Sequence, residues 1–292
     1  MRDVRAQLYV SDSGNNSVGE YDSSTGATIH SSLLPVISSP ISIAISGNNL
    51  FVVTHNTIGE YNVSNGSATN VSLISLPSSA IDIKISGNNL FAVSFSGTIS
   101  EYDITTGATI HASLVSGLSA PHGIAISGNH LFVTTTESTT KGEIREYDAT
   151  TGAVINASLV SGLSEPYGVA ILDNNLFVAN YGSKNIGKYD ATTGAVINAS
   201  FVSGLNTPSA IAISGNELFV INSFQINKYD ATTGAALNVP LVSGFKSPGG
   251  LAIITPTDTP TLSYWELAIL AILLLITIGR LLPPLRSTFS LN

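Results

Sequence analysis

One phrase of about 42 residues recurs six times along most of the chain, from Leu8 to Ile254. The fifth copy reads LFVANYGSKNIGKYDATTGAVINASFVSGLNTPSAIAISGNE, and every copy opens on a Leu-aromatic step. The copies begin at Leu8, Leu50, Leu90, Leu131, Leu176 and Leu218. A repeat this short cannot bury its own apolar faces, so the copies must stack into a single object.

Each copy contains four short apolar runs separated by Gly, Asn, Pro or Thr-Gly, which is typical of a four-stranded antiparallel meander. In the fifth copy the runs are 176–180, 186–190, 195–202 and 210–214. No segment before Thr255 has a sustained helical period. Because a radial arrangement leaves only short protected edges, we predict an all-β fold, a six-bladed β-propeller of four-stranded antiparallel blades.

The two ends of the repeats predict how the ring closes. The chain opens on the Leu8 strand, and residues 248–254 form the strand that normally precedes a Leu-aromatic step. The last strand should therefore pair beside the first three and complete blade one. We expect a single propeller domain over residues 1–254, followed by one C-terminal transmembrane helix.

Two recurrent turns separate the strands. In the turn from Asp190 to Gly194 the Asp side chain can accept turn N–H groups, while Gly takes the positive φ that closes the hairpin. The same turn begins at Asp22, Asp103, Asp148 and Asp230, and a degenerate copy begins at Asn62. In the turn that follows Ser214 we expect both Gly215 and Asn216 to have positive φ.

Composition excludes some functions. With 11 basic and 19 acidic residues and a net charge of −8, the chain lacks the basic face that nucleic acid requires. There is no Cys, so disulfides and thiolate metal sites are excluded.

The N-terminus lacks the apolar stretch of about 7 to 15 residues that a secretory signal needs. Since an exported protein needs such a signal, we infer that the true start lies upstream or that the sequence is a fragment.

Propeller sites usually form at the mouth of the central channel, and the alignment indicates two sets of residues there. The position four residues after each leading Leu gives Asp12, Thr54, Ser94, Thr135, Asn180 and Asn222. The position after the Pro that opens the inner strand, or its equivalent, gives Ile41, Ile81, His122, Tyr167, Ser209 and Gly249. Neutral hydrogen-bonding side chains around a concave mouth favour a weak saccharide or peptide site.

Asp82 and Lys84 are the charged irregularity of the inner strands, because the other copies have small residues at both positions. Two residues apart on one strand, they point to the same face, where each can neutralise the other. They are either a self-compensated structural pair or part of the binding site.

The remaining histidines and the turn aspartates indicate no metal site. His30 and His111 fall on the outermost strand, where solvated surface residues are expected, and His130 takes a turn position. Each turn Asp supplies one carboxylate, far short of a calcium loop. We expect no cofactor and no metal.

The phrases LFVANYGSKNIGKYDATTG and PYGVAI resemble NHL-type and YVTN-type propeller repeats over Leu8 to Ile254. This resemblance implies the propeller fold. The families it points to serve ligand binding, protein contact and, in some relatives, lactone hydrolysis or lyase chemistry, so it leaves the function open.

The composition changes at Thr255. Residues 255–261 form a stiff Thr/Pro linker, and the stretch 262–282, about 31 Å long as a helix, matches a membrane core of about 30 Å. Tyr264 and Trp265 would lie in an aromatic belt. Arg280 lies near the C-terminal end of the span and Arg286 follows it, so the positive-inside rule places the tail 283–292 in the cytoplasm and the propeller outside.

The residues Pro260, Thr261, Leu262, Ser263 and Trp265, the apolar run and Arg280 together resemble the IPTL-CTERM sorting signal, a relative of PEP-CTERM signals of Gram-negative bacteria. The resemblance implies a temporary anchor that an exosortase-like membrane protease recognises. It places the propeller at the cell surface or in the periplasm; the competing reading is a tail-anchored protein with a cytoplasmic propeller.

Three possibilities remain open, of which the third is a redundant repeat scaffold with no small-molecule site. The first is a non-enzymatic surface propeller that binds glycans, matrix or proteins. The second is a propeller hydrolase or lyase acting at the channel mouth through Asp12, His122, Tyr167 and Asn180, with His55 as a further histidine for lyase chemistry. A gluconolactonase-like site would need several oxygens converging on a divalent ion, and the mouth offers one carboxylate, Asp12.

Overall fold

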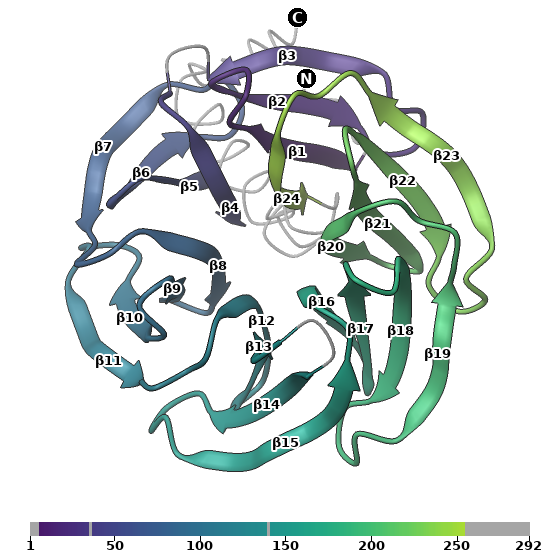
Figure 1. The fold of residues 1–292 in the computed structure, drawn as a ribbon. Helices are drawn as coiled ribbons and strands as arrows, with labels where there is room; N and C mark the ends of the chain where they lie inside the picture. The colour runs from purple at the N-terminus through teal and green to yellow at the C-terminus, as the bar shows by residue number, and fades with distance from the viewer. Residues whose placement is uncertain (1–5, 35–36, 139–140, 255–292) are drawn as a thin grey trace, which may run out of the picture. The chain divides into compact units, whose positions relative to one another are not determined.

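The structure, a computed structural model, describes residues 6–34, 37–138 and 141–254. These residues form six four-stranded antiparallel sheets arranged radially around a central axis, as Figure 1 shows. The predicted six-bladed β-propeller is therefore confirmed. Four predicted features lie outside the described residues: the linker 255–261, the transmembrane helix 262–282, the tail 283–292 and the sorting residues. Within the described ranges there is no helix with the length and hydropathy that a membrane crossing requires.

Each blade runs outward from the channel through four strands. The innermost strands are β4 (Pro40–Ser46), β8 (Ala80–Ser86), β12 (Pro121–Ser127), β16 (Pro166–Leu172), β20 (Pro208–Ser214) and β24 (Pro248–Ile254). The second strands are β1 (Gln7–Asp12), β5 (Asn49–Thr54), β9 (Asn89–Ser94), β13 (His130–Thr136), β17 (Asn175–Asn180) and β21 (Glu217–Asn222). The third strands are β2 (Ser17–Asp22), β6 (Thr57–Asn62), β10 (Ile99–Asp103), β14 (Gly142–Asp148), β18 (Asn185–Asp190) and β22 (Gln225–Asp230). The outermost strands are β3 (Thr28–Leu34), β7 (Ala68–Ser75), β11 (Thr109–Val115), β15 (Val154–Leu163), β19 (Val196–Val202) and β23 (Ala236–Ser243).

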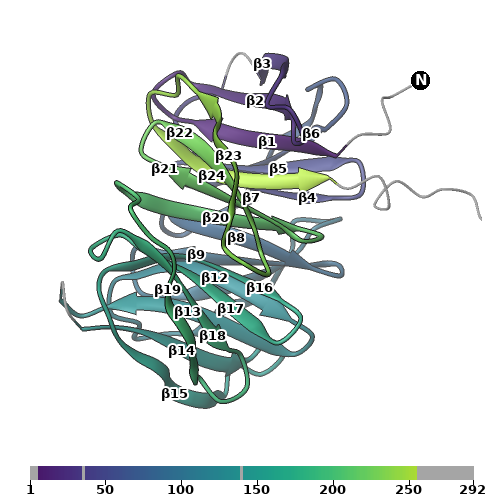
Figure 2. The same cartoon turned by 90° about the vertical axis from the view of Figure 1, so that its right-hand side faces the viewer.

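The ring closes by pairing the last described strand with the first. Blade one has the order β24-β1-β2-β3, so three strands come from the N-terminal end and one from the other end of the repeats. Register pairs join Gln7 to Ile254 and Tyr9 to Ala252. Figures 1 and 2 both show the yellow β24 beside the purple β1. The predicted closure is confirmed.

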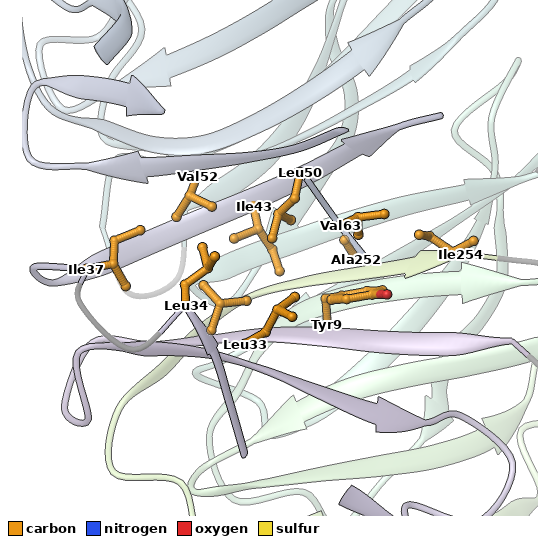
Figure 3. Close-up of a cluster of buried hydrophobic side chains, with 11 residues drawn as sticks. Tyr9, Leu33, Leu34, Ile37, Ile43, Leu50, Val52, Val63, Ala252 and Ile254 are labelled. Atoms are coloured by element: carbon orange, nitrogen blue, oxygen red, sulfur yellow. The ribbon is translucent and has the colours of Figure 1, made fainter. Parts of the chain in front are cut away.

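The core is divided into six apolar clusters, and each lies between two adjacent blades. Figure 3 shows the cluster between blades one and two, where Tyr9 and Leu33 of blade one meet Ile43 and Leu50 of blade two. All four side chains are at least 94% buried. Because each blade can bury its faces only against its neighbours, the fold depends on an unbroken ring.

The turn between the third and outermost strands has the chemistry expected from the sequence. In the turn that begins at Asp148, the Oδ1 atom accepts the N–H groups of Thr150 and Thr151 at 3.0 and 2.8 Å, and Gly152 has φ of 70°. A Cβ atom at Gly152 would lie 1.9 Å from the carbonyl oxygen of Leu114 in the preceding blade. Gly is therefore required by both the backbone angle and the close approach of two blades.

The other recurrent turn corrects one expectation. Gly215 has positive φ, as predicted, but Asn216 does not. Instead, the Asn216 amide donates to Asp230 Oδ2 at 2.7 Å and its oxygen accepts from the Thr232 hydroxyl. The Asn side chain thus joins two turns of one blade, a tertiary role that local turn statistics do not reveal.

The turn aspartates give a prediction about acid stability. Hydrogen bonds from the N–H and hydroxyl groups of the turn threonines lower the pKa values of Asp103, Asp148, Asp190 and Asp230. As the pH falls, the unfolded chain takes up protons first, so this stabilisation is present above about pH 4 and is lost as the pH falls through the lower folded pKa values. We expect the urea midpoint to drop over that range.

Blade two supplies the matched control, because it carries Asn62 at the position of these aspartates, and the Asn62 side-chain oxygen accepts the N–H of Ser64. A chain with Asn in place of all four aspartates should keep the turns and lose less stability on acidification. Urea unfolding at several pH values measures the difference. An identical acid dependence in both chains would contradict the assignment.

Candidate functional site

The channel mouth is a cavity of about 320 Å3 formed by the first residues of the inner strands. Its lining includes five residues of the set predicted from the position after the Pro: Ile81, His122, Tyr167, Ser209 and Gly249. Ile41, the sixth member, is not among the lining residues. A second cavity, of about 370 Å3, continues along the channel and is lined mainly by Ile and Ala of the same strands, including Ile45, Ile85, Ile126, Ile171, Ile213 and Ile253.

A local irregularity aims these side chains into the channel. In the inner strands the register with the second strand shifts directly after the first residue, as between Pro121 and Ile124 and between Pro166 and Val169. Such a bulge re-aims the side chains that it contains. His122 and Tyr167 lie inside the bulges of β12 and β16, which explains why both reach the mouth.

Three aromatic rings stack at one side of the mouth. The His122 and Tyr167 rings are 4.1 Å apart at an angle of 18°, and the Tyr167 and Tyr181 rings are 4.9 Å apart at 28°. Phe95, with 68% of its surface exposed, lines the same cavity. The opposite side carries Ser209 and Gly249, so one half of the mouth has aromatic side chains and the other half has small ones.

The backbone holds this stack in place. A Cβ atom at Gly123 would lie 2.5 Å from the carbonyl oxygen of Tyr167, so Gly123 allows β12 and β16 to approach closely enough for their rings to stack. The buried Thr134 hydroxyl donates to the same carbonyl oxygen at 2.6 Å. Tyr181 is fixed by its N–H, which donates to the carbonyl oxygen of Glu165 at 2.9 Å. The backbone of Glu165 itself has a φ angle of 48°, which is uncommon for a residue other than Gly.

The His122 and Tyr167 side chains are neutral near pH 7. Burial lowers the pKa of His122, which favours the uncharged imidazole. Burial also raises the pKa of Tyr167, and the nearby Tyr181 and Glu165 add to that rise. The mouth therefore presents neutral polar groups on an aromatic surface.

Asp82 and Lys84 lie in the mouth and form the predicted pair. The Lys84 Nζ atom is 3.0 Å from Asp82 Oδ1 and 3.1 Å from Oδ2. The Asp82 carboxylate also accepts the Ser42 hydroxyl at 2.8 Å and the N–H of Ile124 at 3.2 Å. Asp82 thus joins three successive blades at the channel wall, which the sequence did not indicate.

The first predicted set does not line this cavity. Asp12, Ser94, Thr135, Asn180 and Asn222 are at least 92% buried, and Thr54 is half-buried. They sit opposite the first residue of each inner strand, as in the register pairs of Thr135 with Pro121 and Asn180 with Pro166. We expected these positions at the channel mouth, but none of the six is among the residues that line the cavity.

Two members of this set hold the loops that lead into the inner strands. Asp12 accepts the N–H groups of Lys246 at 3.1 Å and Ser247 at 2.8 Å. Asn222 accepts the N–H groups of Asn206 and Thr207 at 2.8 and 3.2 Å. These bonds give the side chains a structural role, and their part in ligand binding stays a prediction.

The residues of the hydrolase or lyase alternative are not all brought together. His122 and Tyr167 stack in the mouth, whereas Asp12 bonds to the loop before β24 and Asn180 donates to Asn185 at 3.0 Å. His55 lies in the exposed turn between β5 and β6. Among the described residues, no cluster of three or more His, Asp or Glu residues has the arrangement of a metal site.

His30 and His111 are exposed, as expected, and each of them, like the exposed His130, also lies against a buried carboxylate. The Nδ1 atoms of His30 and His111 lie 2.7 Å from the buried carboxylates of Glu20 and Glu101 on the adjacent strand. His130 lies 2.6 Å from Glu146 in the same way. The repeats carried a signal for two of these pairs, because both copies with His on the outermost strand have Glu at the facing position of the third strand.

Sequence reasoning also missed Phe95 and Tyr181. Both follow the last residue of a second strand, where other copies have Ser13, His55, Thr136 and Ser223. A large aromatic residue in an otherwise polar turn was the available signal.

Comparisons with known proteins agree with the fold. A profile of the repeat family described as "Outer membrane protein assembly factor BamB" matches residues 3–158. A chain of the "Nidogen/Laminin Complex" crystal structure is similar, with a TM-score of 0.70 and 15% identity over 85% of this chain and 98% of that chain. The computationally designed Ika8 protein matches with a TM-score of 0.53 and 21% identity over 82% of this chain and 71% of that chain. At these identities the two structures indicate a shared fold alone. No curated protein matches the chain.

Proposed function

The chain belongs to the repeat family described as outer membrane protein assembly factor BamB, and from that premise we propose that it is a non-enzymatic binding propeller. Its channel mouth contacts glycans, matrix or other proteins outside the cytoplasm. The observation that carries this proposal is the aromatic stack of His122, Tyr167 and Tyr181 at the edge of an open cavity. Exposed aromatic surface beside a concave mouth is a common feature of ligand sites.

The location is proposed from sequence features and from the family description. The segment 262–282 would hold the propeller at the membrane, and residues 260–263, Trp265 and Arg280 would serve as an IPTL-CTERM sorting signal for an exosortase-like protease. The family description names an outer membrane protein assembly factor, which supports a place in the cell envelope outside the cytoplasm. The NHL-type and YVTN-type resemblance supports the same general role in binding. Fractionation of cells that express the full-length gene, with protease added to intact cells, tests this location.

Replacement of Tyr167 by Ala should weaken binding at least tenfold, because Tyr167 is the ring shared by both stacks. The measurement is biolayer interferometry of the full chain against immobilised envelope polysaccharide, extracellular matrix and envelope proteins. Phe224→Ala is the matched control, since Phe224 is 63% exposed in the corresponding turn of blade six and does not line the cavity. If both variants lost binding equally, or if Tyr167→Ala lost none, the channel mouth would not be the binding site.

The alternative is a hydrolase or lyase, favoured by the pairing of His122 with Tyr167 in one cavity. A screen of lactone and polysaccharide substrates with added divalent metals tests it. Turnover that His122→Ala and Asp12→Ala both abolish, while the circular dichroism spectrum is unchanged, would replace the binding function by an enzymatic one.

A further inference from the structure

The charged groups of the mouth, Asp82 and Lys84, already have their hydrogen-bonding capacity filled by each other and by groups of the adjacent blades. The Asp82 carboxylate accepts five hydrogen bonds, from Lys84 twice, from the Ser42 hydroxyl and from the N–H groups of Ile83 and Ile124. Lys84 also donates to the carbonyl oxygen of Ile83 at 3.3 Å. A carboxylate has about four lone-pair sites and an ammonium has three donors, so neither group retains capacity for a charged ligand.

The groups that remain open to a ligand are neutral. The imidazole of His122 and the hydroxyls of Tyr167, Tyr181 and Ser209 take part in no hydrogen bond among the described residues, and all four side chains are partly exposed. Because burial lowers the pKa of His122 and raises that of Tyr167, both are uncharged near pH 7. A hydroxyl or a neutral imidazole can donate and accept. A ligand rich in hydroxyl groups matches this set, since it also does both.

The shape of the mouth favours a ring-shaped ligand with an apolar face. Phe95 lines the cavity and exposes 68% of its surface, and Tyr181, which lies at the edge and stacks on the lining residue Tyr167, exposes 36%. The C–H groups on the face of a sugar ring carry partial positive charge, which is complementary to the negative face of an aromatic ring. The small residues Ser209, Gly249 and Gly250 leave space on the opposite side. A cavity of about 320 Å3 is at the lower end of ligand sites, which span about 300 to 1,000 Å3.

We propose that the channel mouth binds a neutral saccharide, with a sugar ring stacked on Tyr181 and Phe95 and its hydroxyls bonded to His122, Tyr167 and Ser209. This inference rests on the proposed binding function and names its ligand class. A charged oligosaccharide would have to break the Asp82–Lys84 pair to find a partner for its charge, and a peptide lacks the flat C–H face of a sugar ring that the aromatic rings favour. Both are outcomes of the test below.

The test is isothermal titration calorimetry of the full chain with cellohexaose, maltohexaose, mannohexaose and a galactohexaose. Oligogalacturonate, chitosan hexamer and a mixture of unstructured peptides serve as comparison ligands. The chain is kept in a detergent without a sugar headgroup, because maltoside or glucoside detergents would compete for the site. We expect at least one neutral hexasaccharide to bind more tightly than both charged oligomers.

Variants assign any binding to the mouth. Tyr181→Ala and Phe95→Ala should each weaken binding at least tenfold, whereas Tyr181→Phe should keep most of it because the ring face remains. Phe224→Ala should bind as the unmodified chain does, since among the described residues this exposed ring neither lines the cavity nor stacks on a ring that does, whereas Tyr181 stacks on the lining residue Tyr167. Loss of neutral-sugar binding in Phe224→Ala equal to that in Tyr181→Ala would overturn the inference.

Two results distinguish this inference from the function on which it rests. Binding of only a charged oligomer or peptide, lost in Tyr181→Ala, would overturn the neutral-saccharide ligand and leave the mouth as a binding site. The proposal would also be overturned if no neutral hexasaccharide bound at a ligand concentration of about 10 mM, which is high enough to detect weak binding. Binding to envelope fractions that no mouth variant changes would instead overturn the proposed function itself.

Discussion

A chain that ends at Ser247 should fail to fold as a cooperative unit, because it lacks β24. That strand pairs with β1 in blade one and contacts the inner strands of blades two and six. It contributes Leu251 and Ile254, which are 93% and 95% buried. Burial of two such side chains is worth about 3 to 6 kcal/mol. Because the whole stability of a protein is about 5 to 15 kcal/mol, this loss and the opened ring should together abolish the unfolding transition.

The matched control is a chain that ends at Ile254, which keeps β24 and lacks the same C-terminal segment beyond it. It should show a single urea transition and dispersed amide resonances, while the chain ending at Ser247 should bind a hydrophobic dye and show no sharp transition. If both chains unfolded at the same midpoint, pairing of β24 with β1 would not be what closes the ring.

Replacement of Asp82 by Ser should destabilise the propeller by about 2 to 3 kcal/mol. The change leaves the Lys84 ammonium without its carboxylate and the N–H of Ile124 without an acceptor. The full cost of breaking a buried pair is about 3 to 5 kcal/mol, and we expect less here because the Lys84 side chain is 32% exposed and water can reach it. Urea unfolding followed by circular dichroism gives the change in free energy.

Blade two provides the control for this prediction, because it carries Ser42 and Ala44 at the two equivalent positions. The double variant Asp82→Ser/Lys84→Ala should therefore recover to within about 1 kcal/mol of the unmodified chain, and the double-mutant cycle should give a favourable coupling energy. A double variant as unstable as Asp82→Ser would show that Asp82 acts through the blade-to-blade bonds alone and that its pairing with Lys84 adds nothing.

Some of the site could be predicted because it depends on short-range geometry. Asp82 and Lys84 are two residues apart on one strand, so their common face follows from the period of a β-strand. His122 and Tyr167 hold the same position in successive copies, and equivalent positions in a propeller converge on the channel. The two residues were therefore placed together from alignment alone.

Other features escaped prediction because they depend on contacts between segments. Asp12, Asn180 and Asn222 were expected in the mouth, but their side chains are buried and bond to neighbouring loops and strands. Tyr181 reaches Tyr167 only because its turn is bonded to the carbonyl oxygen of Glu165. Neither effect leaves a pattern in the local sequence.

The sequence by itself determined the number of blades, the four strands of each blade and the closure of the ring. The hydrophobic period, the turn residues and the repeat length are local properties of the sequence, and each of them recurs in six copies. Only the tertiary structure decided which side chains meet at the mouth and which of them remain open to a ligand. That outcome depends on strand register and on hydrogen bonds between blades, as in the saturation of Asp82 by Ser42 and Ile124, and these are made only when the ring is assembled.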